Sequence, residues 1–196
     1  MDQRNALITG ATSGIGEATA RLLAKNRYNL VLCGRRREKL ENLKNELSAF
    51  TSVTTLSFDV RDYEAVKASL QSLTGGWRKI DVLINNAGNA HGLDPIQRGN
   101  VADWDAMMDI NVKGLLYVSR EVIPGMTEQK SGHIINIGSI AGKEVYPNGN
   151  VYCASKFAHE GISEALGKEA KPFNIAVTAV APGSFRTDWA GRSMTR

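Results

Sequence analysis

A tyrosine and a lysine four positions apart, in the segment YCASK at residues 152–156, could transfer protons together. The stretch 150–170 predicts a long helix, and residues four apart on a helix share a face. A free tyrosine ionises at about pH 10, but an ammonium a few ångströms away would lower that pKa by roughly two units. The spacing therefore predicts either a general base, Tyr152, with its activator, Lys156, or simply a packed ring beside a solvated amine.

The segments that would have to position this pair alternate between short apolar blocks and helical patterns. Residues 40–47 and 66–73 carry apolar side chains three and four apart, as on one face of a helix. The blocks suit strands that are buried on both faces of a parallel sheet. They lie at residues 5–9, 28–33, 53–58, 81–85, 133–137 and 174–180. We therefore expect a single domain over residues 1–196 with an α/β fold, a Rossmann-like doubly wound parallel sheet of six strands.

Three glycines follow the first block directly and precede a helical pattern. Such glycines let the turn adopt left-handed backbone angles and let a phosphate approach the helix N-terminus. A glycine-rich turn can also be purely structural, but its place after the first strand favours dinucleotide binding. The residues expected to line the cofactor here are Gly10, Thr12, Ser13, Gly14, Ile15 and Gly16. In the helix that follows, Ile15, Ala18 and Leu22 are expected to face the core.

Three consecutive arginines, Arg35, Arg36 and Arg37, come directly after the second block and Gly34. At this point of a dinucleotide-binding fold, an acid selects NAD and a basic group accommodates the additional phosphate of NADP. No acid occurs before Glu38, so the sequence favours NADP(H) over NAD(H). We expect Arg35 to contact that phosphate, because guanidinium binds phosphate in a two-pronged geometry, and Arg37 to begin a solvated helix. Arg36 could do either.

Charge, hydropathy and cysteine usage argue against several other functions. The 24 basic and 20 acidic residues give a formal charge of +4, too small an excess to indicate a nucleic-acid or membrane partner. No apolar run could span a bilayer or form a secretory signal, so we expect a cytoplasmic protein. Cys33 and Cys153 form no disulfide framework, and the isolated His91, His133 and His159 predict no metal site.

Together these segments resemble the short-chain dehydrogenase/reductase family from about residue 4 onward. The segments that carry the resemblance occur in the family's order and at its spacing. They are TGATSGIG (9–16), DV (59–60), NNAG (85–88), Asn111 in DINVKG, Ser139 in IGSIAG, YCASK (152–156) and PGSFRT (182–187). One such segment would be weak support, whereas all of them in order favour the catalytic interpretation of Tyr152 and Lys156.

The resemblance implies further cofactor contacts at the ends of the predicted strands. Asp59 and Val60 would bind the adenine, although an Asp after a strand is also a common helix cap. Asn85 would brace the sheet through hydrogen bonds. The other cofactor contacts that the family implies lie at Asn86, Ala87, Gly88, Tyr152, Lys156, Pro182, Gly183 and Thr187.

The resemblance also implies the catalytic set, which is Asn111, Ser139, Tyr152 and Lys156. Ser139 would bond the substrate oxygen and stabilise the developing alkoxide, while Tyr152 transfers the proton. Lys156 would also hold the nicotinamide ribose, and Asn111 would anchor a water chain to solvent. The expected reaction interconverts a secondary alcohol and a carbonyl on a small molecule, with NADP(H) as the hydride carrier.

Within the family, residues 1 to about 152 most resemble the NADP-dependent 3-hydroxy acid dehydrogenases, which oxidise serine, allo-threonine and related acids. The segment after Pro182 and Gly183 departs from that branch, which usually has a TEFS-like stretch there. Family members also continue with another helix and strand, so we expect the carboxyl-terminal part of the family fold to be missing. A non-catalytic or truncated NADP-binding scaffold, or a reductase of another carbonyl, therefore stays an alternative.

Family resemblance further implies a homotetramer or homodimer. The helices that would be buried between subunits begin near Asp103 and Tyr152. Their apolar residues could lie at this interface or belong to an ordinary core. They include Leu115, Leu116, Phe157 and Ile162.

Overall fold

The computed structural model describes residues 3–183, and within them the six predicted strands form one sheet. The strands are β1 (Asn5–Thr9), β2 (Asn29–Gly34), β3 (Val53–Ser57), β4 (Val82–Asn85), β5 (Gly132–Ile137) and β6 (Ile175–Val180). Their order is β3-β2-β1-β4-β5-β6, and every neighbouring pair is parallel. The strand order therefore reverses between β1 and β4, where open parallel sheets bind their ligands. This confirms the predicted doubly wound α/β fold, and each strand lies within one residue of its predicted range.

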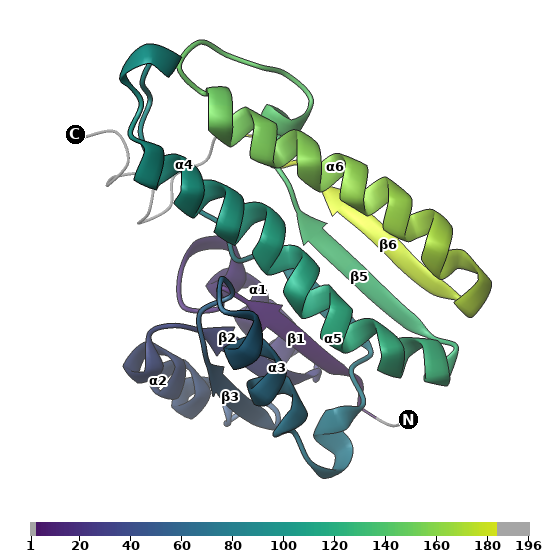
Figure 1. The fold of residues 1–196 in the computed structure, drawn as a ribbon. Coiled ribbons are helices and arrows are strands. Elements are labelled where there is room, and N and C mark those ends of the chain that lie inside the picture. Colours follow the sequence, from purple (N-terminus) through teal and green to yellow (C-terminus); the bar gives the residue numbers. More distant parts are fainter. Residues whose placement is uncertain (1–2, 184–196) are drawn as a thin grey trace.

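Six helices connect these strands and cover both faces of the sheet. They are α1 (Gly14–Lys25), α2 (Arg37–Leu47), α3 (Tyr63–Gln71), α4 (Val101–Met108), α5 (Gly114–Gln129) and α6 (Asn150–Ala170). Side chains alternate along β1: Leu7 packs with residues of α3 and α5, whereas Ala6 and Ile8 pack with residues of α1 and α2. Figure 1 shows α5 and α6 lying across one face of the sheet, with β5 and β6 behind them. Both faces of the central strands are therefore core, which explains their uninterrupted apolar sequence.

The buried face of α1 differs from the expected one. Its buried residues are Gly16, Ala20 and Ala24, whereas Ala18 is exposed and Leu22 is 61% exposed. The prediction that Ala18 and Leu22 face the core was therefore wrong. The helix presents its smallest side chains to β1 and β2, and this close approach selects residues by size rather than by hydropathy.

Neither a membrane-spanning helix nor a cluster of metal ligands is found within residues 3–183. In that range no helix combines the length and the apolar character needed to cross a membrane. Over the same range, no group of three His, Cys, Asp or Glu side chains is arranged so that it could hold a metal ion. Cys33 and Cys153 are both buried with free thiols, and burial raises the pKa of the Cys33 thiol.

Candidate active site

The turn between β1 and α1 approaches the end of β4 closely. Gly10 and Gly14 have φ angles of 63° and 56°, a left-handed conformation that glycine adopts without strain. A Cβ on Gly10 would lie 2.9 Å from the Asn86 amide nitrogen, and one on Gly16 would lie 2.5 Å from the Gly10 carbonyl oxygen. Glycine at these positions lets the loop pack directly against itself and against the residues that follow β4. This packing holds the N-terminus of α1, a favourable place for an anion, beside the end of β4.

The three arginines after β2 occupy three different environments. Arg36 reaches across the glycine loop, and its guanidinium donates to Thr12 Oγ1 at 2.6 Å and to Ser13 Oγ at 2.9 Å. Arg35 is directed toward solvent, with a side chain 62% exposed and one guanidinium nitrogen 3.6 Å from Asp59 Oδ2. Arg37 begins α2, as predicted. The sequence did not decide whether Arg36 contacts the phosphate or begins the solvated helix. Only the packed structure shows that its side chain binds the glycine loop.

Asp59 and Val60 follow β3 at the same edge of the sheet. The Asp59 carboxylate accepts from the Arg61 guanidinium at 2.7 Å. Burial alone would raise the pKa of Asp59, but the hydrogen bonds from Arg61 and the charge of Arg35 outweigh it and hold that pKa below its usual range. The helix-cap alternative for Asp59 is wrong, because Asp62 caps α3 by accepting from the Ala65 backbone N–H at 3.0 Å.

The loop after β4 is held by a residue that the sequence analysis did not single out, Thr9. Its hydroxyl accepts from the backbone N–H groups of Asn86 and Ala87, each at 3.0 Å. The Asn86 amide in turn donates to the Thr9 carbonyl oxygen at 2.9 Å. A polar residue that directly follows three apolar ones at the end of the strand was the signal in the sequence. Asn85 braces the sheet as expected, since its amide donates to Ser119 Oγ at 3.0 Å and to Asn136 Oδ1 at 2.9 Å.

Gly88 is the point where three of the predicted motifs meet. A Cβ on Gly88 would lie 3.3 Å from Asn111 Oδ1 and 3.7 Å from Lys156 Nζ. The Asn111 side chain is fully buried and exchanges hydrogen bonds of 2.8 and 2.9 Å with the Asn89 backbone. Its amide also donates to Ser155 Oγ on α6 at 3.0 Å. Residues far apart in the sequence thus come together at the carboxyl edge of the sheet.

Asn111 can take this position because the helix around it is irregular. Residues Asp109–Lys113 form a π-helical turn between α4 and α5. The turn is followed by Gly114, where a Cβ would lie 2.7 Å from Val60 Cγ2. Such π-helical turns are common at functional sites, because the wider turn redirects one side chain. Sequence periodicity does not reveal this irregularity, so the element around Asn111 could be placed only by the structure.

Tyr152, Lys156 and Ser139 converge at the end of β5. Lys156 is 5% exposed, donates to the Ile137 carbonyl oxygen at 3.1 Å, and has its Nζ 5.9 Å from the centre of the Tyr152 ring. Ser139 begins the short 3₁₀ turn Ile140–Gly142, and its hydroxyl accepts from the Ala141 N–H at 3.1 Å. The predicted shared helix face of Tyr152 and Lys156 is therefore present in α6.

The pKa values at this pair depart from the sequence expectation. Burial raises the pKa of Tyr152, and hydrogen bonding to Ser139 acts in the opposite direction without reversing it. Burial also lowers the pKa of Lys156 to about 8, so the amine is still mostly charged at pH 7. The protein's own groups therefore do not lower the tyrosine pKa, and the expected lowering by Lys156 is not found.

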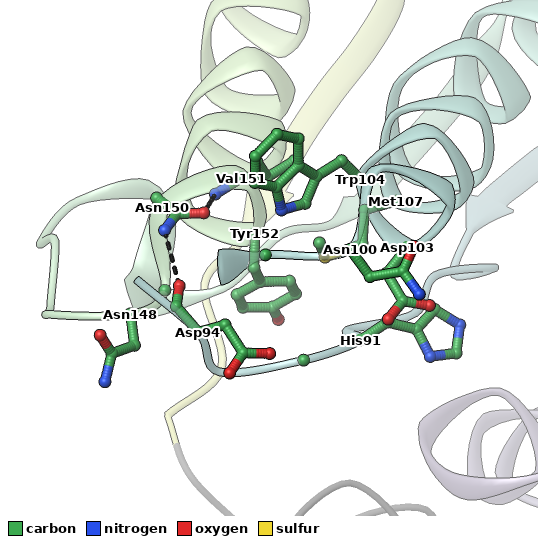
Figure 2. Close-up of a pocket in the computed structure, with 13 residues that line it drawn as sticks. His91, Asp94, Asn100, Asp103, Trp104, Met107, Asn148, Asn150, Val151 and Tyr152 are labelled. Atoms are coloured by element: carbon green, nitrogen blue, oxygen red, sulfur yellow. Dashed lines mark hydrogen bonds between the residues drawn. The ribbon is translucent and has the colours of Figure 1, made fainter. Parts of the chain in front are cut away.

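A pocket in front of Tyr152 was not anticipated from the sequence. It lies between the loop that follows β4, the start of α4 and the start of α6. Figure 2 shows the Tyr152 side chain projecting from α6 toward the segment that carries Asp94, with Trp104 on the other wall. Asn150 ties this segment to α6, because its amide donates to the Asp94 carbonyl oxygen at 3.0 Å. The polar and charged lining residues include His91, Asp94, Asn100, Asp103, Asn148 and Tyr152.

The family model for short chain dehydrogenases matches residues 4–195. The chain belongs to the short-chain dehydrogenase family. This membership confirms the family resemblance and the expected class of enzyme, and every motif that carried the resemblance lies within the matched range.

Individual relatives within the family agree with the branch suggested by the amino-terminal motifs. The NADP-dependent 3-hydroxy acid dehydrogenase of Salmonella typhi is 46% identical over 177 residues, which are 90% of this chain and 71% of the relative. The sulfoacetaldehyde reductase 2 of Chromohalobacter salexigens is 42% identical over 184 residues, 93% of this chain and 73% of the relative. Among solved structures, the closed form of serine dehydrogenase complexed with NADP⁺ has a TM-score of 0.90 at 41% identity, covering 95% of this chain and 75% of that one.

The last predicted family motif is only partly described. The Pro182 carbonyl oxygen accepts from the Ile140 N–H at 3.0 Å, which ties the end of β6 to the turn that carries Ser139. Gly183 is exposed, and a Cβ there would meet no atom of residues 3–182 within 4 Å. Thr187, the remaining predicted cofactor contact, lies outside the described residues.

Proposed function

We propose that this chain is an NADP(H)-dependent oxidoreductase that interconverts a hydroxyl group and a carbonyl, with 3-hydroxy acids such as serine or allo-threonine as its substrate class. The observation that carries the proposal is the convergence of Tyr152, Ser139 and Lys156 at the end of β5, beside Gly88 and Asn111. The names of the relatives support the same cofactor and substrate class.

The cofactor would lie along the carboxyl edge of the sheet, and the residues there fit a dinucleotide. Its pyrophosphate would rest against the glycine loop at the N-terminus of α1, where backbone N–H groups and the helix dipole favour an anion. Arg35 and Arg36 offer guanidinium groups for the additional phosphate of NADP, and Asp59 offers an acceptor for the adenine amino group. When bound, NADP supplies or accepts the hydride.

The protein's own groups would handle the proton and the substrate oxygen. Ser139 would orient the oxygen and stabilise negative charge on it, and Tyr152 would take the hydroxyl proton during oxidation. Lys156 would hold the ribose through the N–H donors of its ammonium group. The positive charge of the oxidised nicotinamide would favour the phenolate of Tyr152. The raised pKa of Tyr152 in the protein alone makes this assistance necessary.

The residues that line the pocket in front of Tyr152 favour, as substrate, a hydroxy acid that carries an amino group over one that does not. The carboxylates of Asp94 and Asp103 both border Gly92, at 3.5 and 3.8 Å from a Cβ placed there. Two carboxylates beside the reacting centre favour the ammonium group of serine or allo-threonine. Both kinds of substrate carry a carboxylate, but only the amino-bearing acids also bring a positive group that can offset the charge of the two aspartates.

The test is to mix the protein with NADP⁺ and, separately, serine, allo-threonine, 3-hydroxybutyrate and simple alcohols, and to follow the absorbance of the reduced nicotinamide. NADPH with sulfoacetaldehyde tests the other carbonyl substrate suggested by a relative. We expect turnover of the amino-bearing hydroxy acids. Binding of NADP without turnover of any of these compounds would overturn the proposal and favour a non-catalytic scaffold.

We also infer a homodimer or homotetramer formed through α5 and α6. Leu116 on α5 and Phe157 on α6 are 43% and 44% exposed, unlike Leu115, which is buried in the core. Large apolar side chains on an outer face favour association. Light scattering after size exclusion should give a dimer or tetramer mass, and Phe157→Glu should lower it; a monomeric wild-type protein would contradict the inference.

A further inference from the structure

A row of four buried polar side chains runs across the sheet under α5 and α6. Its members are Ser119 on α5, Asn85 on β4, Asn136 on β5 and Ser163 on α6, and none is more than 6% exposed. The Asn85 amide donates to Ser119 Oγ and to Asn136 Oδ1. The Asn136 amide donates to Ser163 Oγ at 2.9 Å, and that hydroxyl donates to the His159 carbonyl oxygen at 2.6 Å. This polar row therefore links two strands to the two helices that cover them.

The helix α6 is attached to the end of β5 at two points on one helical face. Lys156 donates to the Ile137 carbonyl oxygen at 3.1 Å, and Ser163, seven residues further along α6, accepts from Asn136. Side chains seven apart on a helix project from the same face, and Asn136 directly precedes Ile137 in β5. One contact alone would let the helix turn or slide about it, whereas two contacts fix its position along the strand. The second contact therefore helps to place Tyr152 relative to the end of β5.

The helix α5 and the π-helical turn before it are attached to the β4 segment in the same way. The Asn111 side chain exchanges hydrogen bonds with the Asn89 backbone, and Ser119, eight residues further on, accepts from Asn85. Asn85 and Asn136 are direct partners in the parallel pairing of β4 with β5. Asn136 is therefore the residue that joins the elements around Asn111 to α6.

Stability alone does not explain the polar row. Asn85 Oδ1 is buried and has no hydrogen-bond partner in the part of the chain that the structure describes. An unpaired buried oxygen destabilises the folded state, and apolar side chains of similar shape would avoid that loss. A buried polar network does hold its elements in one register, because any shift breaks its directional hydrogen bonds. The row is therefore better suited to fixing register than to adding stability.

We propose that Asn136 is a positioning residue, which through Ser163 sets the register of α6 against β5 and so places Tyr152 against Ser139 for proton transfer. The inference rests on the proposed function, because its kinetic effect is measured in that reaction. Asn136 and Ser163 act only through other residues, since neither lines the pocket in front of Tyr152. A displacement of about 1 Å between reacting groups lowers the rate by up to about 10²-fold.

Two single variants test this role, with oxidation of serine by NADP⁺ as the probe reaction. Asn136→Leu keeps a branched side chain and removes both hydrogen bonds of the amide. We expect its kcat to fall about tenfold or more, with KM and NADP affinity within about twofold of the wild type. Ser163→Ala removes only the contact between β5 and α6, and its kcat should fall by a smaller factor.

Asn29→Leu is the matched control at the other end of the strands. The Asn29 amide donates to Asn5 Oδ1 at 3.0 Å, and these two residues begin β2 and β1 as direct partners. The substitution also removes an amide–amide link within the sheet, so it should lower stability and leave kcat unchanged. An equal loss of kcat in Asn29→Leu and Asn136→Leu would overturn the proposal, and so would a wild-type kcat in Asn136→Leu.

The double variant Asn136→Leu/Ser163→Ala separates positioning from stability. Ser163→Ala alone leaves the Asn136 amide as a buried donor without its partner, which is destabilising. Adding Asn136→Leu removes that donor, so the double variant should unfold at a higher urea concentration than Ser163→Ala. Its kcat should nevertheless stay as low as that of Asn136→Leu. A kcat that recovers together with stability would show a purely structural role and overturn the proposal.

Crystal structures of the wild type and of Ser163→Ala give a result that requires neither turnover nor the folding of Asn136→Leu. We expect α6 to shift against β5 by about 0.5 Å or more, which is the tolerance of a catalytic arrangement, and to carry Tyr152 away from Ser139. An unchanged position of α6 would overturn the proposal. A protein that oxidises no hydroxy acid but shows this shift would refute the proposed function, and not the positioning role of Asn136.

Discussion

Lys156 donates a hydrogen bond to the Ile137 carbonyl oxygen at 3.1 Å, which fixes the buried amine at the end of β5 beside the Tyr152 ring. This contact uses one of the three donors of the ammonium and leaves two for a cofactor and for the proton path. A strand end and a helix face thus share the positioning of the reactive pair.

Tyr152→Phe should abolish turnover while leaving NADP binding within about twofold. The substitution removes only the hydroxyl that transfers the proton, and general acid–base catalysis contributes a factor of about 10² to 10⁴. Tyr28→Phe, just before β2 at the opposite edge of the sheet, is the control and should keep the wild-type rate. Steady-state kinetics measure the loss of turnover, and calorimetric titration with NADP measures the cofactor affinity. A Tyr152→Phe enzyme that keeps most of its rate would show that another group transfers the proton.

Alanine at each of the three arginines after β2 should give three different results. Arg35→Ala should weaken NADP about tenfold or more and NAD little, because it removes a charge available to the additional phosphate. Arg36→Ala should weaken both cofactors, because its hydrogen bonds hold Thr12 and Ser13 in the glycine loop, and should weaken NADP more, because its charge is also available to the additional phosphate. Arg37→Ala, exposed at the start of α2, is the control. The dissociation constants of each variant for NADP and for NAD measure these effects. If Arg35→Ala lowered the affinity for both cofactors equally, the contact between Arg35 and the phosphate would be rejected.

Gly16→Ala should destabilise the protein by about 1–3 kcal/mol and weaken cofactor binding. The new methyl group would lie 2.5 Å from the Gly10 carbonyl oxygen and would overlap the Asn86 amide. Gly161→Ala on α6 provides the matched comparison, because its Cβ meets nothing within 4 Å and alanine favours helix. Urea unfolding should show opposite signs for the two substitutions. Similar free energies of unfolding for Gly16→Ala and wild type would mean that the loop and the β4 end can separate at little cost.

Glu160→Ala should lower kcat several-fold by loosening the turn that carries Ser139. The Glu160 carboxylate lies beside Gly138, where a Cβ would be 3.3 Å from Oε1, and it pairs with Lys143 at 2.6 Å. Glu164→Ala, one turn further along α6, removes an ion pair that is largely exposed and should change neither rate nor stability. The comparison of kcat and NADP affinity for both variants checks this. Equal kcat values in the two variants would show that Glu160 does not help to position Ser139.

His159 should make the protein lose stability as the pH falls from about 6.5 to about 4. In this window the unfolded chain binds a proton at His159 and the folded protein does not, so protonation favours unfolding. The contribution is roughly 2–3 kcal/mol at pH 4.5. Urea unfolding at pH 7 and pH 4.5 should therefore show a smaller acid-induced loss for His159→Gln than for the wild type. An identical loss in both proteins would contradict the buried, neutral imidazole.

Much of the fold could be predicted because its signals are local. Apolar blocks indicated every strand, and the central strands β1, β2 and β4 are buried on both faces as such blocks suggest. The edge strands β3 and β6 are partly exposed, so the expected burial on both faces was wrong for them. Glycine spacing located the loop before α1, and the four-residue spacing of Tyr152 and Lys156 on a helix needed only helical geometry. The face of α1 was mispredicted because close helix–sheet packing selects Gly16, Ala20 and Ala24 by size, which a hydropathy pattern does not contain.

By itself, then, the sequence determined the order of strands and helices, the glycine loop and the residue types of the reactive set. Only the tertiary structure decided that Arg36 crosses the glycine loop, that Gly88 brings Asn111 and Lys156 together, and that burial raises the pKa of Tyr152. These relationships join residues distant along the chain. They depend on how closely the packed elements approach and on how much water they exclude, and neither quantity is a property of any local segment.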